Sequence, residues 1–363
     1  MSELVRAAVR TGPGAMEVRR FPRPKIGPDE ALLRVERCGI CGSDVESFRS
    51  ERPRPASIPG HEPLGIIEEI GERAAERWKV GPGDRVAVEI LVPCRNCDLC
   101  LTGRYMACRN KPAGYGGNTP IEREPALWGG YAEYLYLHPN AIVHKVDKSL
   151  PADVAVMFNP LGAGVRWVAH LGGAKLGDSV LILGPGQRGL MAVIAAKMVG
   201  ASTVIVTGLE KDEHKLALAR EFGADYTINV DREDTVARVM EITDGAGVDV
   251  ALDVTPMAHQ PVIDAIASVT HGGRVVLAGL KGRVPMSFVS DSIIQKGATV
   301  VGAYSVDAQA YMEAIGIIES RRFPLEKLHT HTFPLEEAGK AIEVLAGDVP
   351  GERAVHVSID PWA

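Results

Sequence analysis

The chain has 363 residues, of which 46% are hydrophobic and 24% charged, and its formal net charge at pH 7 is −6. This length and composition predict a soluble globular protein of two domains, and the negative charge predicts no nucleic-acid partner. The N-terminal sequence lacks the apolar segment of a signal peptide, and no apolar run reaches membrane-spanning length. We therefore expect a cytoplasmic protein with no membrane partner, whose six cysteines are metal ligands or free thiols rather than disulfides.

Residues 1–158 are predicted to form a mostly β domain. Apolar segments of strand length, for example Ala31–Val35 and Gly65–Ile70, alternate with turns rich in glycine and proline. The pattern favours a partly open barrel of short strands.

Two motifs in this β region carry candidate metal ligands, Cys41-Gly-Ser43-Asp44 and Gly60-His61-Glu62. A thiolate and an imidazole from separate loops can hold a zinc ion that keeps an open position for substrate. Such an ion polarises an alcohol oxygen and lowers its pKa, and Ser43 would pass the alcohol proton outward. Taken alone, His61 would be interpreted as a buried structural histidine. Cys38 and Cys41 have the spacing of a redox pair, but such a pair belongs on a βαβ unit that this region lacks.

Four cysteines lie within the loop 93–109, at Cys94, Cys97, Cys100 and Cys108. Two C-x-x-C turns with a nearby fourth cysteine suit a closed tetrahedral zinc site, which would hold together a loop with little core of its own. An iron–sulfur cluster also takes four cysteines, but its bacterial spacing is tighter and usually ends in Cys-Pro, whereas Cys108 precedes Arg109. We therefore predict a structural zinc ion in this loop.

Residues 159–302 change to an alternation of strands and helices, which predicts a parallel, doubly wound α/β sheet, that is, a Rossmann domain. The predicted strands are Val180–Leu183, Thr203–Val206, Tyr226–Asn229, Val248–Asp253, Arg274–Ala278 and Thr299–Gly302. The predicted helices include Leu190–Val199, Asp212–Phe222 and Gln260–Val269.

The first of these strands runs into a G-x-G-x-x-G turn, which reads Gly184-Pro-Gly186-Gln187-Arg188-Gly189 and opens a helix. Gly184 permits the tight turn, Gly186 lets a pyrophosphate approach the backbone, and Gly189 lets helix and strand pack closely. The helix amide groups then face the phosphates. This predicts a dinucleotide site that includes Gln187 and Arg188, and the alternative is an ordinary glycine-rich βαβ turn.

The tail, residues 303–363, contains a predicted helix near Leu335–Ala346 and a predicted strand at Ala354–Ile359. We expect the tail to return to the first domain, which would make that domain discontinuous.

With these motifs in this order, the chain resembles the zinc-dependent medium-chain alcohol and polyol dehydrogenases over nearly its whole length. The segment Gly129-Gly130-Tyr131-Ala132-Glu133-Tyr134 adds to the resemblance. It implies a discontinuous GroES-like catalytic domain, a Rossmann domain, an active site in the cleft, and a homodimer or homotetramer. It also implies hydride transfer between NAD or NADP and a small-molecule alcohol, polyol or sugar, or the matching carbonyl compound. By family position, Phe48, Trp128 and Tyr304 are candidate substrate contacts.

Three positions depart from the pattern of that family. Asn159 stands where relatives supply a third zinc ligand, and its neutral amide is a poorer ligand than a carboxylate or thiolate. Glu62, which enters the coordination shell in some relatives, can compensate. Glu46 replaces a histidine of the proton relay; a carboxylate there can pass a proton or bind a hydroxyl, and the alternative is a solvated surface residue.

The third departure is Gly208, which ends the second strand of the Rossmann domain, where NAD-specific relatives carry an acidic residue. Without that carboxylate a 2′-phosphate meets no repulsion, and Lys211 can attract it, although Glu210 works against this. We therefore favour NADP over NAD.

Two other functions are consistent with parts of this sequence. A zinc-free quinone or enone reductase shares the fold, but relatives of that type lack the pair Cys41 and His61. A redox sensor that binds zinc and a dinucleotide without catalysis would use the four-cysteine loop and leave Cys41 and His61 idle. Two zinc ions per chain would support the dehydrogenase, and one would support either alternative.

Overall fold

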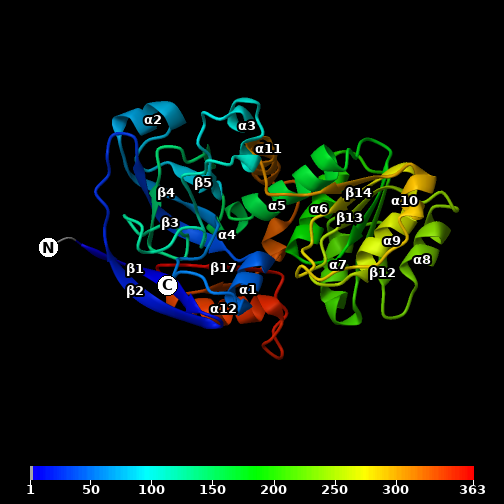
Figure 1. Cartoon of the computed structure of the whole chain (residues 1–363). Helices are drawn as coiled ribbons and strands as arrows, with labels where there is room; N and C mark the ends of the chain where they lie inside the picture. The colour runs from blue at the N-terminus through cyan, green and yellow to red at the C-terminus, as the bar shows by residue number, and fades with distance from the viewer. Residues whose placement is uncertain (1–2) are drawn as a thin grey trace. The chain divides into compact units, whose positions relative to one another are not determined.

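The computed structural model describes residues 3–363, which form two compact units. The first unit comprises the chain up to Phe158 together with Ile315–Ser320 and His329–Ala363, and the second comprises Asn159–Ala314 and Arg321–Leu328. We call them unit 1 and unit 2. Unit 1 is therefore built from both ends of the chain, coloured blue and red in Figure 1.

Unit 1 is organised around the buried strand β3 (Ala31–Gly39), both edges of which are paired. One edge pairs with β4 (Glu62–Ile70), and the other pairs with β8 (Tyr134–Leu137) and, beyond it, with β17 (His356–Ile359). The full strand order is β16-β17-β3-β4-β5-β9, where β16 is His329–Phe333, β5 is Arg85–Val88 and β9 is Val143–Lys145. The predicted mostly β domain is confirmed.

Smaller elements surround this sheet. The strands β1 (Leu4–Gly12) and β2 (Ala15–Pro22) form a hairpin, and the short strands β6 (Leu91–Val92) and β7 (Ala113–Gly114) form a second pair. The helices α1 (Gly42–Arg49) and α12 (Ala338–Ala346) pack on each other. Phe48 of α1 and Ile342 of α12 belong to one apolar core with the β3 side chains.

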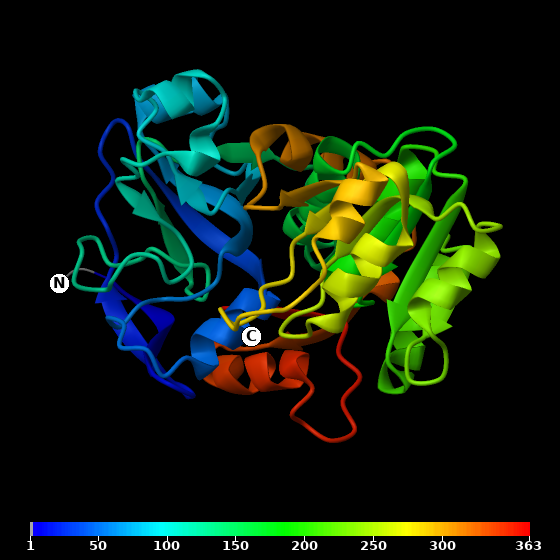
Figure 2. The ribbon, with the colours of Figure 1, turned by 45° about the vertical axis from the view of Figure 1, so that its right-hand side comes forward.

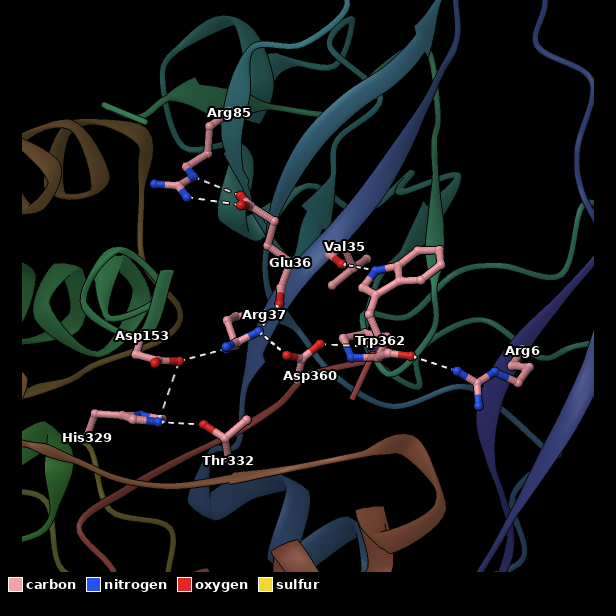
Figure 3. Close-up of polar contacts among 11 residues, drawn as sticks. Arg6, Val35, Glu36, Arg37, Arg85, Asp153, His329, Thr332, Asp360 and Trp362 are labelled. Carbon is pink, nitrogen blue, oxygen red and sulfur yellow. Dashed lines mark hydrogen bonds and ion pairs between the residues drawn. The ribbon is translucent and has the colours of Figure 1, made fainter. Parts of the chain in front are cut away.

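The chain after β17 is fixed to β3 by polar contacts (Figure 3). The Arg37 guanidinium donates to Asp153 at 2.6 Å and to Asp360 at 2.5 Å. The indole Nε1 of Trp362 donates to the carbonyl oxygen of Val35 at 2.7 Å. The C-terminal residues are thus an integral part of unit 1.

Unit 2 contains a six-stranded parallel sheet in the order β12-β11-β10-β13-β14-β15 (Figures 1 and 2). The strands are β10 (Ser179–Leu183), β11 (Thr203–Gly208), β12 (Tyr226–Asn229), β13 (Val248–Asp253), β14 (Val269–Leu277) and β15 (Thr299–Gly302). The order reverses between β10 and β13, where an open α/β sheet places its ligand crevice at the carboxyl ends of the strands. The predicted Rossmann fold is confirmed.

Helices cover both faces of this sheet. On one face α6 (Gln187–Met198) packs on β10 and β11, and α7 (Glu213–Glu221) packs on β11 and β12. The other face carries α8 (Thr235–Ile242), α9 (Gln260–Ser268) and α10 (Asp291–Lys296), among which α9 packs on β13 and β14. The side chains of α6 are almost all buried, so the glycine-rich turn before it has a rigid support.

Unit 2 extends further along the chain than the predicted boundary at residue 303. An unpredicted helix, α11 (Ala308–Glu319), begins in this unit, and its Ala310 and Tyr311 are fully buried. Tyr311 lies beside Gly162 of α5 (Phe158–Val165), and Asp307 pairs with Arg166. These contacts keep residues 303–314 in unit 2.

Within residues 3–363, no helix has the length and apolar character that a membrane span requires.

Candidate metal and dinucleotide sites

The four cysteines of the loop 93–109 converge in unit 1. Cys94 follows β6, Cys97 is the N-cap of the short helix α3 (Asp98–Leu101), Cys100 lies within that helix, and Cys108 follows the next turn. The sulfur–sulfur distances are 3.8 Å for Cys94 and Cys100, 3.5 Å for Cys97 and Cys100, and 3.9 Å for Cys97 and Cys108. A tetrahedral zinc ion with Zn–S bonds of about 2.3 Å requires sulfur–sulfur distances of about 3.8 Å, so this donor set fits zinc.

The electrostatics of these thiols also suits a cation. The backbone N–H groups of Asn96 and Cys97 donate to the Cys94 sulfur and lower its pKa to about 6. Burial and the neighbouring thiols of Cys97 and Cys108 raise the pKa of Cys100 to about 12. Four adjacent thiolates repel one another, and a divalent cation removes that repulsion.

A second group in unit 1 consists of Cys41, His61 and Glu62. The three residues are buried, and one ligand atom of each lies within 4.8 Å of the others. Cys41 is the N-cap of α1, and Glu62 is the first residue of β4. The Nε2 atom of His61 lies 3.8 Å from Oε1 of Glu62. A thiol, an imidazole and a carboxylate form a donor set that catalytic zinc accepts, so these residues also fit the metal.

Asp44, to which the sequence motif gave no role, orients this group. One of its oxygens lies 3.3 Å from Nδ1 of His61, and the other accepts a hydrogen bond of 2.8 Å from the backbone N–H of Cys41. Burial alone would lower the pKa of His61, but Asp44 and Cys41 outweigh it and raise that pKa well above its usual value. Because Nδ1 faces Asp44, Nε2 is the ring atom left for a metal, as in other carboxylate–histidine–zinc arrangements.

Two glycines leave room for this group. A Cβ on Gly39 would lie 2.4 Å from Oε2 of Glu62, which occupies that space across the β3–β4 pair. Gly60 has a φ of +87°, and a Cβ there would lie 2.4 Å from the ring of Tyr131. Glu62 and His61 can therefore reach their positions only beside glycine.

The predicted relay residues Ser43 and Glu46 lie one helical turn apart on α1. Ser43 is exposed and Glu46 is half-buried. Burial, with a contribution from the Cys41 thiol, raises the pKa of Glu46. This partial burial sets Glu46 apart from a fully solvated surface glutamate.

The candidate substrate contacts Phe48 and Trp128 prove to be core residues. Phe48 packs beside Gly339 of α12, and Trp128 forms ring contacts with Tyr115 and Tyr136. Tyr304, in unit 2, has 62% of its surface exposed.

The glycine-rich turn of unit 2 connects β10 to α6. Gly184 has a φ of +106°, which glycine adopts without strain. A Cβ on Gly189 would lie 1.9 Å from the carbonyl oxygen of Gly184, whereas a Cβ on Gly186 would meet no atom within 4 Å. The turn is therefore closed on its inner side and open at Gly186, the α6 N-cap, as a pyrophosphate-binding backbone requires.

At the end of β11, Gly208 pairs in register with Asn229 of β12. A Cβ on Gly208 would lie 2.8 Å from Pro185 and 3.0 Å from Leu216. Close packing therefore favours glycine there, independently of any effect that a carboxylate at this position would have on the cofactor. The Glu210 carboxylate accepts a hydrogen bond from Arg232, which follows β12. Arg232 could not be predicted from the sequence, because it comes beside Glu210 only through the parallel pairing of β11 with β12.

Asn159, the uncertain candidate at the third ligand position, lies in unit 2, and its amide has partners there. Its Oδ1 accepts a hydrogen bond of 3.0 Å from Arg188, and its Nδ2 donates to the Tyr311 hydroxyl at 2.8 Å.

Sequence comparisons match both parts of the chain to described families. Residues 27–148 match the alcohol dehydrogenase GroES-like domain, and residues 189–320 match the zinc-binding dehydrogenase family. A protein of Mycobacterium tuberculosis named "Probable alcohol dehydrogenase" is 44% identical over 363 residues, with 99% of each chain covered. An erythritol/L-threitol dehydrogenase of Mycolicibacterium smegmatis is 33% identical, with 99% of this chain and 98% of the relative covered. An L-threonine 3-dehydrogenase of Pyrococcus horikoshii is 35% identical over 97% of this chain and 98% of its own.

Solved structures share the whole fold. An alcohol dehydrogenase of Thermotoga maritima superposes with a TM-score of 0.87 at 28% identity, covering 99% of this chain and 100% of its own. A Sinorhizobium meliloti protein described as a "putative zinc-binding dehydrogenase" and bound to NADP gives a TM-score of 0.85 at 26% identity, with the same coverage.

Proposed function

Because the chain belongs to the zinc-type medium-chain alcohol dehydrogenase family, we propose that it catalyses reversible hydride transfer between an alcohol and NAD(P), with one catalytic and one structural zinc ion per chain. The observation that carries the proposal is the convergence of Cys41, His61 and Glu62 in a buried group separate from the four-cysteine cluster. A protein that needed zinc for its fold alone would have no use for this second group.

Within this proposal each residue has a distinct role. When bound, zinc would polarise the alcohol oxygen, and the nicotinamide would take the hydride. Cys41, His61 and Glu62 would hold the metal, and Asp44 fixes the ring of His61. Ser43 would accept the alcohol proton, and Glu46, one turn further along α1, would receive it from Ser43.

The substrate class we propose is a secondary alcohol or polyol. Support comes from the relatives named for erythritol and L-threitol and for L-threonine, all of which carry a secondary hydroxyl group. The cluster of four thiols suits a reducing compartment, so we propose that the enzyme works in the cytoplasm.

The experiment that tests the proposed function combines a substrate panel with a metal count. Secondary alcohols, tetritols and L-threonine are offered with NAD and with NADP, and zinc is measured by mass spectrometry on the purified protein. We expect two zinc ions per chain and oxidation of at least one alcohol. One zinc ion per chain without alcohol oxidation would favour a zinc-free reductase or a redox sensor on this fold.

For the cofactor we propose a preference for NADP, supported by Gly208 at the end of β11 and by the cations Lys211 and Arg232 nearby. An arginine near this position accommodates the 2′-phosphate in NADP-dependent relatives of the fold. We expect Arg232→Ala to lower kcat/KM for NADP about tenfold, equivalent to about 1.4 kcal/mol, and to leave kcat/KM for NAD nearly unchanged.

The matched control is Arg238→Ala, which removes an arginine of α8 that pairs with Glu241. Gly208→Asp is a less clean probe, because its Cβ would also displace Pro185. A wild-type enzyme that prefers NAD and loses that preference on Glu210→Ala would identify Glu210 as the ribose ligand and refute our proposal.

For assembly we propose a homodimer that joins through unit 2. β15 is the last strand of its sheet, and apolar side chains near it are exposed, with Val289 at 71% and Ile294 at 76%. A second copy of β15 would pair with this edge and cover these side chains.

We expect Ile294→Glu to convert the assembly to monomers of 38.8 kDa, as measured by light scattering after size-exclusion chromatography. Leu176→Glu, at a position of unit 2 that is 84% exposed, should leave the mass of the assembly unchanged. A dimer that tolerates Ile294→Glu would place the contact elsewhere.

A further inference from the structure

The amide of Asn159 is fixed on both sides inside unit 2. Its Oδ1 accepts from the Arg188 guanidinium at 3.0 Å, its Nδ2 donates to the Tyr311 hydroxyl at 2.8 Å, and only 2% of the residue is exposed. Tyr311 is itself 1% exposed, so the Asn159 side chain has a defined orientation in which its only metal-binding atom, Oδ1, faces a cation.

Arg188 is held by a second contact. Its guanidinium carbon lies 5.3 Å from the ring centre of Trp167, a cation–π distance, and Trp167 belongs to a π-helical segment, Arg166–Leu171, that follows α5. Asn159 and Trp167 thus hold one guanidinium from two sides.

The position of Arg188 at the N-terminus of α6 indicates that its charge serves to bind an anion. Arg188 is the second residue of α6, and no acidic residue lies in the first turn of that helix. A cation in the first turn opposes the helix dipole, whose N-terminal end attracts anions. An anion bound at the open backbone of Gly186 would be attracted by both the dipole and the guanidinium.

The metal group does not need Asn159. Cys41, His61 and Glu62 supply three ligands from unit 1, the number that catalytic zinc sites take from the protein. A ligand role would also place the metal cation beside the Arg188 guanidinium at the same oxygen, and the two positive charges would repel each other.

We propose that Asn159 is a positioning residue for Arg188, which binds the dinucleotide pyrophosphate, and that Asn159 is not a metal ligand. This inference rests on the proposed function. The resemblance places a third zinc ligand at position 159, and this inference gives that position a role in cofactor binding instead.

The test measures zinc content and NADPH affinity, the latter by fluorescence titration, on the same purified proteins. We expect Asn159→Ala to keep the wild-type zinc content and to raise the Kd for NADPH about tenfold. Arg188→Met should raise this Kd at least as much, and the double variant should bind no more weakly than Arg188→Met alone, because Asn159 acts through Arg188. Glu62→Ala is the matched control, and it should lose one zinc ion and keep its NADPH affinity.

Asn159→Asp provides a second variant, which retains an oxygen for Arg188. We expect it to bind NADPH within about threefold of wild type and to lose zinc to a chelator at the wild-type rate. Loss of one zinc ion from Asn159→Ala with unchanged NADPH affinity, or slower zinc loss from Asn159→Asp, would overturn the inference while leaving the proposed function intact. A wild-type protein that binds neither NADPH nor NADH would overturn both.

Discussion

We expect Cys41→Ala or His61→Ala to abolish turnover while the affinity for the dinucleotide stays nearly intact. Both residues belong to the buried metal group of unit 1, whereas the glycine-rich turn lies in unit 2. Metal polarisation of a substrate oxygen lowers the activation barrier by several kcal/mol, so kcat should fall by at least about a thousandfold when the metal is lost. The measurements are steady-state turnover of the best alcohol and fluorescence titration with NADPH.

Cys38→Ala is the matched control for this prediction. Cys38 is also a buried cysteine of unit 1, and its sulfur lies beside Gly60 and Gly130. It accepts a hydrogen bond from the backbone N–H of Glu62, but it is not one of the three candidate ligands Cys41, His61 and Glu62. The Cys38→Ala enzyme should keep both zinc ions and most of the wild-type activity. A Cys41→Ala enzyme with near-normal kcat would instead support a zinc-free reductase.

We expect Cys94→Ser to remove one zinc ion and to destabilise unit 1, with little effect on dinucleotide binding in the protein that remains folded. The loop 93–109 contains only short helices and several exposed residues, so its order depends on the four sulfurs. Structural zinc contributes directly to the free energy of folding. We expect a loss of about 3 kcal/mol or more, seen as a fall in Tm of about 10 °C.

The measurements for Cys94→Ser are thermal unfolding and zinc content. Cys100→Ser should give the same result, because its sulfur lies 3.8 Å from that of Cys94. Unchanged zinc content in either variant would refute the four-cysteine site.

Much of unit 2 could be predicted from local patterns. The bounds of β12, β13 and β15 agree with the prediction, because each is a short apolar run between turns. Helix α11 was missed although Ala310 and Ala314, four residues apart, mark a buried face. Its partners in α5 are distant in sequence, so the boundary of unit 2 could not be read from the tail alone.

The candidate site likewise contains residues that the sequence predicts and contacts that only the structure shows. Cysteine spacing and the Gly60-His61-Glu62 motif predicted two groups whose atoms do converge. Asp44 lay within a predicted motif, but its contact with His61 depends on how β4 meets the start of α1. The partners of Asn159 come from α6 and α11, and no pattern within one segment predicts such a meeting.

The pairing of β17 with β3 affects the order in which the two units can fold during synthesis on the ribosome. β3 is made early, but the strand that pairs with its Cys38–Gly39 end, and the Asp360 that pairs with Arg37, are made only after the whole sheet of unit 2 (Figure 3). Domains usually fold in the order of synthesis, whereas here the sheet from β10 to β15 comes from one continuous stretch of chain and can close first. The nascent chain therefore carries an open edge at the Cys38–Gly39 end of β3 until β17 has been made, and an unpaired strand edge can pair wrongly with another chain.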